Sequence, residues 1–149
     1  MFINKLSRLS LVFIISLFAL TSPAMSAGKG YITIVTKEGP VKVLVEYAVT
    51  PAEKAKGLMF RKRLPKKEGM LFIYQKPRAV AMWMKNTPLS LDMIFINRKG
   101  RIRQIEEKTE PNSTRKIHSG GQVSAVLEMI GGSAEDFGIG IGDSVIIQN

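Results

Sequence analysis

The stretch from Trp83 to Asp92 holds the side chains of this chain that are best suited to binding a ligand. Trp83 is the only tryptophan, and the alternation of a β-strand would put it on the same face as Lys85. An indole ring beside an ammonium group suits a sugar ring or a flat anionic ligand. The pattern therefore predicts a stacking platform, and the alternative is a core tryptophan whose indole N–H finds a buried partner.

A polar bend follows this strand. Asn86 tolerates left-handed turn geometry, and Thr87 is held extended because a proline follows it. Lys85 and Asp92 flank the six-residue connection from 86 to 91, a spacing that would let an ammonium and a carboxylate meet across a hairpin neck. We therefore expect Lys85 to pair with Asp92.

Two carboxylates, Asp92 and Glu128, lie at the edges of apolar strands, where burial would raise the pKa of a carboxyl group into a range useful for acid or base chemistry. Paired acids of this kind serve glycoside hydrolysis at particular separations. The alternative is structural: Asp92 accepts hydrogen bonds from loop N–H groups or pairs with Lys85, and Glu128 pairs with an arginine such as Arg61.

Other kinds of catalytic or metal site find little support. His118 is the only histidine and the chain has no cysteine, which excludes multi-histidine and thiolate metal sites, disulfides and thiol catalysis. A Ser119 or Ser113 nucleophile beside His118 lacks the sequence of a nucleophile elbow. The glycines at 138, 140 and 142 follow an expected helix instead of opening one, so no phosphate loop is predicted. We expect no metal and no cofactor.

Several separated motifs in fixed order resemble the domain-of-unknown-function family numbered 192. The likeness spans roughly residues 32 to 148 and rests on Gly57-Leu58-Met59-Phe60-Arg61, Gly69-Met70-Leu71-Phe72, Trp83-Met84-Lys85-Asn86-Thr87-Pro88-Leu89-Ser90-Leu91-Asp92 and Val126-Leu127-Glu128. The resemblance implies a compact, mostly β domain of sandwich or jelly-roll type, and it implies no established activity. The chain departs from that family at Ile117, where an aromatic residue is common, and at Gly140-Ile141, where a lysine is common.

The first 26 residues resemble a secretory signal peptide. Lys5 and Arg8 precede an apolar run from 9 to 20, and small residues at Ser22, Ala24 and Ser26 offer cleavage sites. The run is shorter than the roughly 20 residues of a membrane-spanning helix. We therefore expect an exported protein, periplasmic or secreted, with no stable membrane span after cleavage, and an uncleaved anchor is the alternative. Residues 27–149 then make a single β domain.

The chain carries 22 basic and 12 acidic residues, a formal charge of +10. This excess favours anionic neighbours such as lipid headgroups, envelope polymers or acidic ligands. Residues 61–67 hold five of the basic residues, which indicates either a solvated loop or a patch for an anionic surface. Export and the absence of aromatic residues among the basic ones argue against nucleic acid.

The elements that position these residues are mainly short strands. Strands are predicted at 31–36, 41–47, 70–74, 78–85, 93–97, 101–106, 123–129 and 144–147. Thr50-Pro51-Ala52-Glu53 has the form of a capping box, which predicts a helix from about Pro51 to Met59. The side of this helix that faces inward is expected to carry Ala52, Ala55, Leu58 and Met59. Ser133 is expected to cap a brief helix through Phe137, and residues 107–122 form one long irregular loop.

Together these patterns predict a mostly β fold: a single compact β-sandwich or jelly-roll-like barrel with one short N-terminal helix and a brief C-terminal helical turn. The function that we expect is a non-catalytic binding module of the cell envelope for a small polar or anionic ligand, such as a carbohydrate. The site would lie in a groove roofed by the 107–122 loop, formed by Trp83, Lys85, Asn86, Thr87, Asp92, Arg61 and Glu128. The alternatives are a hydrolase of envelope polymer that uses Asp92 and Glu128, and a structural or protein-interaction domain.

Overall fold

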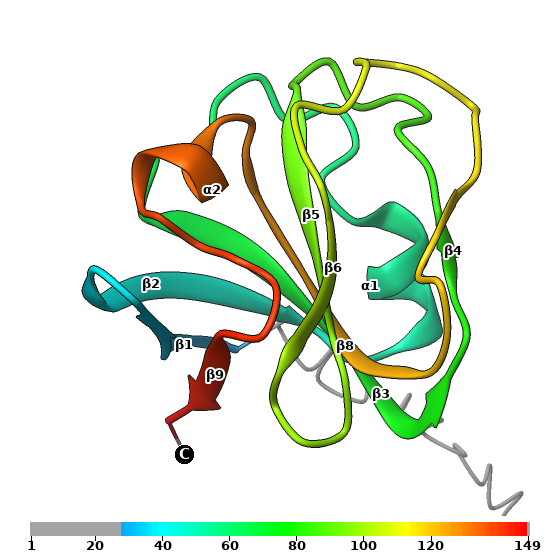
Figure 1. Cartoon of the computed structure of the whole chain (residues 1–149). Helices are drawn as coiled ribbons and strands as arrows, with labels where there is room; N and C mark the ends of the chain where they lie inside the picture. Colours follow the sequence, from blue (N-terminus) through cyan, green and yellow to red (C-terminus); the bar gives the residue numbers. More distant parts are fainter. Residues whose placement is uncertain (1–27, 149) are drawn as a thin grey trace, which may run out of the picture.

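The computed structural model describes residues 28–148, and β-strands dominate this part of the chain (Figure 1). The elements are β1 (Lys29–Thr36), β2 (Gly39–Ala48), α1 (Pro51–Lys56), β3 (Glu68–Arg78), β4 (Ala81–Met82), β5 (Leu91–Ile96), β6 (Ile102–Glu106), β7 (Ile117–His118), β8 (Val123–Ile130), α2 (Ser133–Asp136) and β9 (Ser144–Ile147). The prediction of a mostly β fold is confirmed. The signal-peptide prediction falls on residues outside the described part.

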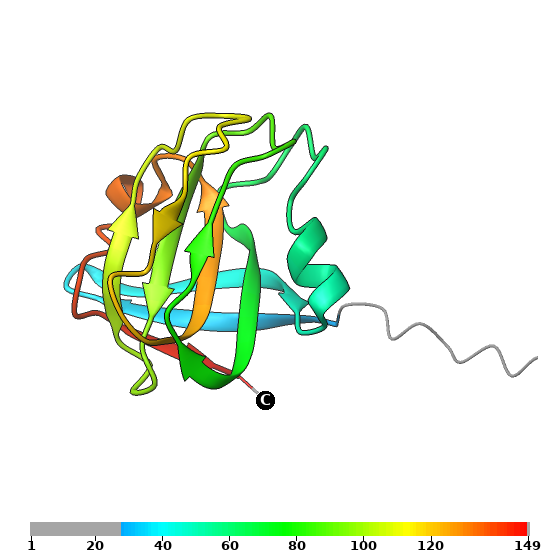
Figure 2. The ribbon, with the colours of Figure 1, turned by 90° about the vertical axis from the view of Figure 1, so that its right-hand side faces the viewer.

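Seven of the strands form one sheet in the order β6-β5-β8-β3-β2-β1-β9, and β4 pairs with β7 in a small second sheet. All neighbours in the large sheet run antiparallel except β2 and β3, which are parallel and are connected through α1. The large sheet curls strongly, so that β9 and β1 lie at a steep angle to β5 and β6 (Figures 1 and 2). The result is a half-barrel.

The sheet separates two apolar cores. One core lies within the curl and includes Ile32, Val43, Leu71, Ile94 and Leu127. The other lies on the opposite face of the central strands and includes Leu58, Leu64, Phe72, Met84, Phe95, Ile117 and Val126. Because α1 and its following segment, β4 and β7 cover this second face, the central strands β3, β5 and β8 are buried on both sides, as Figure 2 illustrates for α1.

The capping box at α1 forms as the sequence predicts. The Thr50 hydroxyl accepts a hydrogen bond from the Glu53 N–H at 3.2 Å, and the Glu53 carboxylate accepts from the N–H groups of Val49 and Thr50, each at 2.9 Å. The helix is shorter than predicted, ending at Lys56 before Gly57, whose φ is +48°. The expected inward side is partly wrong: Ala52 and Ala55 are exposed, whereas Leu58 is buried and Met59 is half-buried.

The predicted strand over 78–85 is wrong. β3 continues through Pro77 to Arg78, and of the residues after Arg78 in this range only Ala81–Met82 form a strand. The ladder between β3 and β8 shifts register between Ile73 and Arg78, which leaves the proline in an irregular part of the ladder where its missing N–H costs little.

Two predictions near the C-terminal half need correction. The 107–122 loop contains β7, which pairs with β4 through Ala81 and His118, so it is only partly irregular. Gly132 is the residue before α2, and the hydroxyl of Ser133 donates to the Ile130 carbonyl at 2.6 Å instead of capping the helix. Within residues 28–148, no helix is long and apolar enough to cross a membrane.

Candidate functional site

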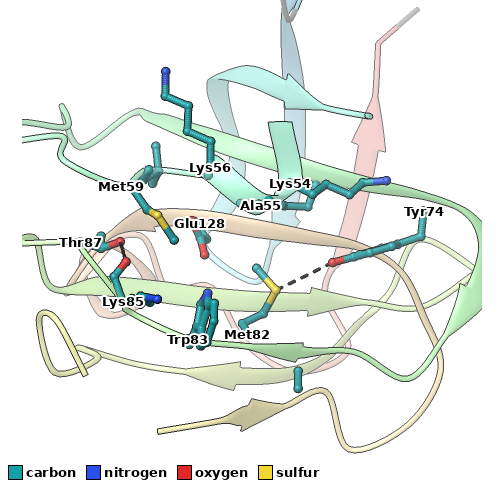
Figure 3. Close-up of a pocket in the computed structure, with 14 residues that line it drawn as sticks. Lys54, Ala55, Lys56, Met59, Tyr74, Met82, Trp83, Lys85, Thr87 and Glu128 are labelled. Atoms are coloured by element: carbon teal, nitrogen blue, oxygen red, sulfur yellow. Dashed lines mark hydrogen bonds between the residues drawn. The ribbon is translucent and has the colours of Figure 1, made fainter. Parts of the chain in front are cut away.

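A cavity of about 240 Å³ opens on the face of the sheet that α1 covers (Figure 3). One wall comes from α1 and the residues after it, the other from the segment that begins with β4, and the floor from β3 and β8. The lining residues are Lys54, Ala55, Lys56, Gly57, Leu58, Met59, Phe72, Tyr74, Ala81, Met82, Trp83, Lys85, Thr87 and Glu128. The volume is slightly below that of a typical ligand pocket, so the cavity suits a small molecule.

Glu128 forms the polar part of the floor. Its cross-strand neighbours are Met70 on β3 and Met93 on β5, both buried, and only 4% of its own surface is exposed. This apolar surrounding raises the pKa of the Glu128 carboxyl group to about 8 through desolvation. At neutral pH the group is therefore mostly protonated and presents both a hydrogen-bond donor and an acceptor.

The Glu128 carboxyl group is open to a ligand. The Glu128 side chain makes no hydrogen bond and no ion pair within residues 28–148. In this part of the chain, every side-chain oxygen or nitrogen that is fully buried has a hydrogen-bond partner, so the Glu128 oxygens cannot be fully buried. Its oxygens therefore reach solvent inside the cavity, and Figure 3 places them between the two walls. A hydroxyl or amide of a bound molecule would satisfy them.

Trp83 stands in the wall opposite α1 and is 39% exposed, so the prediction of an open ring holds and the core interpretation is wrong. Two ammonium groups lie over the indole: Lys85 Nζ is 5.4 Å from the ring centroid and Lys116 Nζ is 3.8 Å from it. Lys85 lines the cavity and Lys116 does not. The expected pairing of Trp83 with Lys85 on one face is thus present.

The wall formed by α1 contributes two more cations, Lys54 and Lys56, and Lys54 lies over the ring of Tyr74 on β3. Lys54 Nζ lies 4.9 Å from the centroid of the Tyr74 ring, and the Tyr74 hydroxyl donates to the Met82 sulfur at 3.8 Å. Burial, with a smaller effect from Glu128, raises the pKa of the Tyr74 hydroxyl, which stays protonated. Tyr74 and Met82 therefore link the floor to the opposite wall at this end (Figure 3).

Asn86 and Thr87 shape the bend as predicted, and only one of them faces the cavity. Asn86 has φ +55°, and its carbonyl accepts from the Phe60 N–H at 2.7 Å, which ties the bend to the segment after α1. Thr87 is buried, lines the cavity and donates its hydroxyl to the Lys85 carbonyl at 3.2 Å. Asn86 is exposed and contacts Met59 through its amide.

Asp92 is not part of the cavity. It faces the other side of the sheet, is fully buried, and accepts from the N–H groups of Lys108 at 2.8 Å, Gly132 at 3.1 Å and Ala134 at 2.8 Å. The predicted pairing with Lys85 is therefore wrong, and the predicted capture of loop N–H groups is correct. Since Asp92 lies opposite Met129 and Glu128 lies opposite Met93, alternation sets the two carboxyl groups on opposite faces.

Arg61 also lies outside the cavity lining. Its guanidinium makes two parallel hydrogen bonds to Glu46, at 2.7 Å and 2.9 Å, so its predicted pairing with Glu128 is wrong. Arg61, and to a smaller extent Lys29, lowers the pKa of the Glu46 carboxyl group. This partly buried pair fixes the segment after α1 to β2, and neither of its residues lines the cavity.

The cavity thus brings together Trp83, Lys85, Thr87 and Glu128 and leaves out Arg61, Asn86 and Asp92. The 107–122 loop contributes no lining residue; it supports the Trp83 segment from outside, where the Met84 N–H donates to the Ser113 carbonyl at 3.0 Å. The other ten lining residues were not predicted as part of the site, and those with long or polar side chains among them include Lys54, Lys56, Met59, Tyr74 and Met82. Alternation along β3 would have placed Tyr74 on the face of Phe72, whereas nothing local indicates where α1 docks.

Within the described residues, no group of three histidine, cysteine or acidic side chains is close enough to hold a metal ion. The chemistry available in the cavity is therefore that of one protonated carboxyl group, one phenol, one indole and several ammonium groups. This set can bind hydroxyl groups, a ring and an acid group together.

Comparisons with known proteins agree on the fold. A crystal structure from Sinorhizobium meliloti 1021, described as "a putative transcription regulator", is 39% identical and superposes with a TM-score of 0.80, covering 82% of this chain and 95% of that one. A protein of unknown function from Novosphingobium aromaticivorans DSM 12444 is 36% identical, with a TM-score of 0.79, and the match covers 83% of this chain and 89% of that one. No curated protein matches the chain. The model of DUF192, "Uncharacterized ACR", matches residues 33–147, and the chain belongs to this family.

Proposed function

We propose that this protein is a non-catalytic binding domain whose cavity holds a small hydroxylated ligand that carries an acid group, such as a sugar acid. The observation that supports this function most directly is Glu128. A neutral carboxyl group without a partner within residues 28–148, on the floor of a cavity, offers one donor and one acceptor to a hydroxylated molecule.

The walls support the same class of ligand. Trp83 offers an aromatic surface on which the apolar face of a sugar ring can pack, and Met59 and Met82 offer adaptable apolar contacts. Lys54, Lys56 and Lys85 line the same cavity, and among the described residues that line it Glu128 carries the only carboxyl group. An anionic group on the ligand would neutralise part of this positive charge.

Calorimetric titration with glucose, glucuronic acid and other small sugar acids tests the proposal. We expect a sugar acid to bind at pH 6.5 with a dissociation constant of about 1 mM or tighter, which is ordinary for a ligand of this size. Glu128→Leu should abolish binding, Trp83→Phe should weaken it several-fold, and Lys99→Gln, a charge change in the exposed β5–β6 turn, should leave it unchanged. Equal binding by the wild type and Glu128→Leu would refute the proposal.

The principal alternative is enzymatic. A hydrolase that relies on both Asp92 and Glu128 requires two carboxyl groups on one side of the substrate path, whereas these two residues lie on opposite faces of the sheet. What remains is Glu128 acting alone, which its raised pKa favours. Release of reducing sugar from a neutral or acidic glycan by the wild type, and its loss in Glu128→Gln, would establish this alternative.

For location we propose the cell envelope, on the strength of the signal-like segment over residues 1–26 and the net charge of +10. For the fold, the pairing of β4 with β7 above one face of the large sheet supports the finer description as sandwich-like, with a short second layer. A structural or protein-interaction role stays an alternative that the titration above would favour if no small molecule bound.

A further inference from the structure

A second hollow, of about 360 Å³, adjoins the cavity. Lys54 and Tyr74 line both, so the pair formed by the ammonium and the phenol ring is the boundary between them. Beyond this boundary the lining consists of Val49, Pro51, Gln75, Lys76 and Arg78. The two spaces therefore follow one another along the same side of β3.

The side chains that line the hollow carry positive charges only. Lys54, Lys76 and Arg78 line it, no carboxylate does, and none of the three cations has an ion-pair partner within residues 28–148. Burial and then the charge of Arg78 lower the pKa of Lys54. The acid next to Lys54 in the chain, Glu53, is held by the N–H groups of Val49 and Thr50. A bound anion would relieve this repulsion.

The strand β3 gives the length of the combined groove. Met70 pairs with Glu128, and the side chains of Phe72 and Tyr74 follow on the same face. From Met70 to Tyr74 the strand advances about 13 Å at roughly 3.3 Å per residue. A molecule that touches both Glu128 and the cations beyond Tyr74 is therefore longer than one sugar ring.

We propose that the cavity and the hollow form one groove that binds an acidic oligosaccharide. One sugar unit lies between Trp83 and Glu128, the chain passes over Tyr74, and a carboxylate of a following unit is bound by Lys54, Lys76 and Arg78. The inference rests on the proposed function, because it extends the same site and names the class of ligand as a glycan of at least two units.

Titration with galacturonic acid oligomers of one to four units, and with the matching neutral galactose oligomers, tests the length and the charge of the ligand. In the acidic series, the affinity should rise about tenfold between the longest oligomer that does not reach the hollow and the next longer one, as expected for one added hydrogen bond to a charged group. We call this rise the step. The neutral series should show no such step. The double variant Lys76→Gln/Arg78→Gln should lose the step and keep the affinity for the monomer.

The double variant Arg98→Gln/Lys99→Gln is the matched control, because it removes the same charge from an exposed turn outside the groove. It should keep the step. Circular dichroism of both variants reports whether they fold, and the substituted side chains are all exposed.

The possible failures are distinguishable. If the monomer binds and the step is missing, or if the neutral series shows the same step, the oligosaccharide inference is wrong and the proposed function stands. If no member of either series binds and Trp83 fluorescence stays unchanged, both are wrong. Tighter binding of a single-stranded oligothymidine than of the acidic trimer would assign the groove to nucleic acid and overturn the inference.

Discussion

At the scale of single residues, Glu128 has the largest effect on how stability depends on pH. The folded chain holds the pKa of this carboxyl group at about 8, while its ordinary value is 4.5. Between these two values the unfolded chain releases the proton and the folded chain retains it, so the free energy of unfolding falls as pH rises. Below pH 4.5 the Glu128 carboxyl group is protonated in both states and costs no stability through ionisation, and above pH 8 the loss of stability has reached its full value.

The substitution Glu128→Gln removes this dependence because glutamine does not ionise in either state. We expect the variant and the wild type to have similar free energies of unfolding at pH 4.5. At pH 8.5 the variant should be more stable by an amount on the order of 4 kcal/mol. Urea denaturation at the two pH values measures the difference, and a constant difference across this range would show that Glu128 titrates normally.

At the scale of elements, Asp92 connects three parts of the chain: the start of β5, the loop at Lys108, and the beginning of α2 at Ala134. Asp92→Ala would leave three N–H groups without their acceptor, which should cost about 3 kcal/mol or more. Asp92→Asn should cost roughly 2 kcal/mol, because an amide nitrogen would face one of these donors. Chemical denaturation measures both losses.

The control for Asp92 is Asp136→Asn, which breaks an exposed ion pair with Lys66 and should change stability by less than about 1 kcal/mol. Ligand affinity should survive in Asp92→Asn, because this residue faces the core within the curl and not the cavity. If Asp92→Asn lost ligand binding without losing stability, Asp92 would have to be counted among the ligand-binding residues.

Elements that depend on neighbouring residues could be predicted from the sequence. The Thr50 capping box and the left-handed Asn86 both follow from side chains that act within a few residues, and both are present. Pro77 misled the strand assignment because a shift in the pairing with β8, far along the chain, accommodates it. A single-sequence pattern carries no information about such a partner.

The candidate site divides in the same way. The sequence correctly predicts that Lys85 lies beside Trp83, two residues away, although the strand that was expected to hold them ends at Met82. The prediction that Arg61 pairs with Glu128 is wrong because Arg61 pairs with Glu46 on β2. This contact depends on where the segment after α1 docks, which the local sequence does not indicate. Lys54 lines the cavity because α1 docks beside it, and Tyr74 lines it because β3 alternation places this residue on the face of Phe72.

At the scale of the whole molecule, the two cores predict where the chain opens first. β3, β5 and β8 are covered on both faces. β9 has four residues, pairs with β1 along its length, has only one bridge on its other side, between Ser144 and Arg101, and ends at the exposed Ile146 and Ile147. Amide hydrogens of the three central strands should therefore exchange slowest, through global unfolding, and those of β9 and β4 fastest. Native-state hydrogen exchange measures this order, and equal protection of β9 and β8 would contradict it.

The pairing of β9 with β1 also governs the order of assembly. Ile32 and Ile34 on β1 lie opposite Ile147 and Val145 on β9. The first strand of the sheet to be synthesised therefore pairs with the last one. A ribosome that adds about 5–20 residues per second leaves that edge of β1 unpaired for several seconds. During synthesis, and during any passage of the unfolded chain across a membrane, this edge is a binding surface for a chaperone or for another copy of the chain.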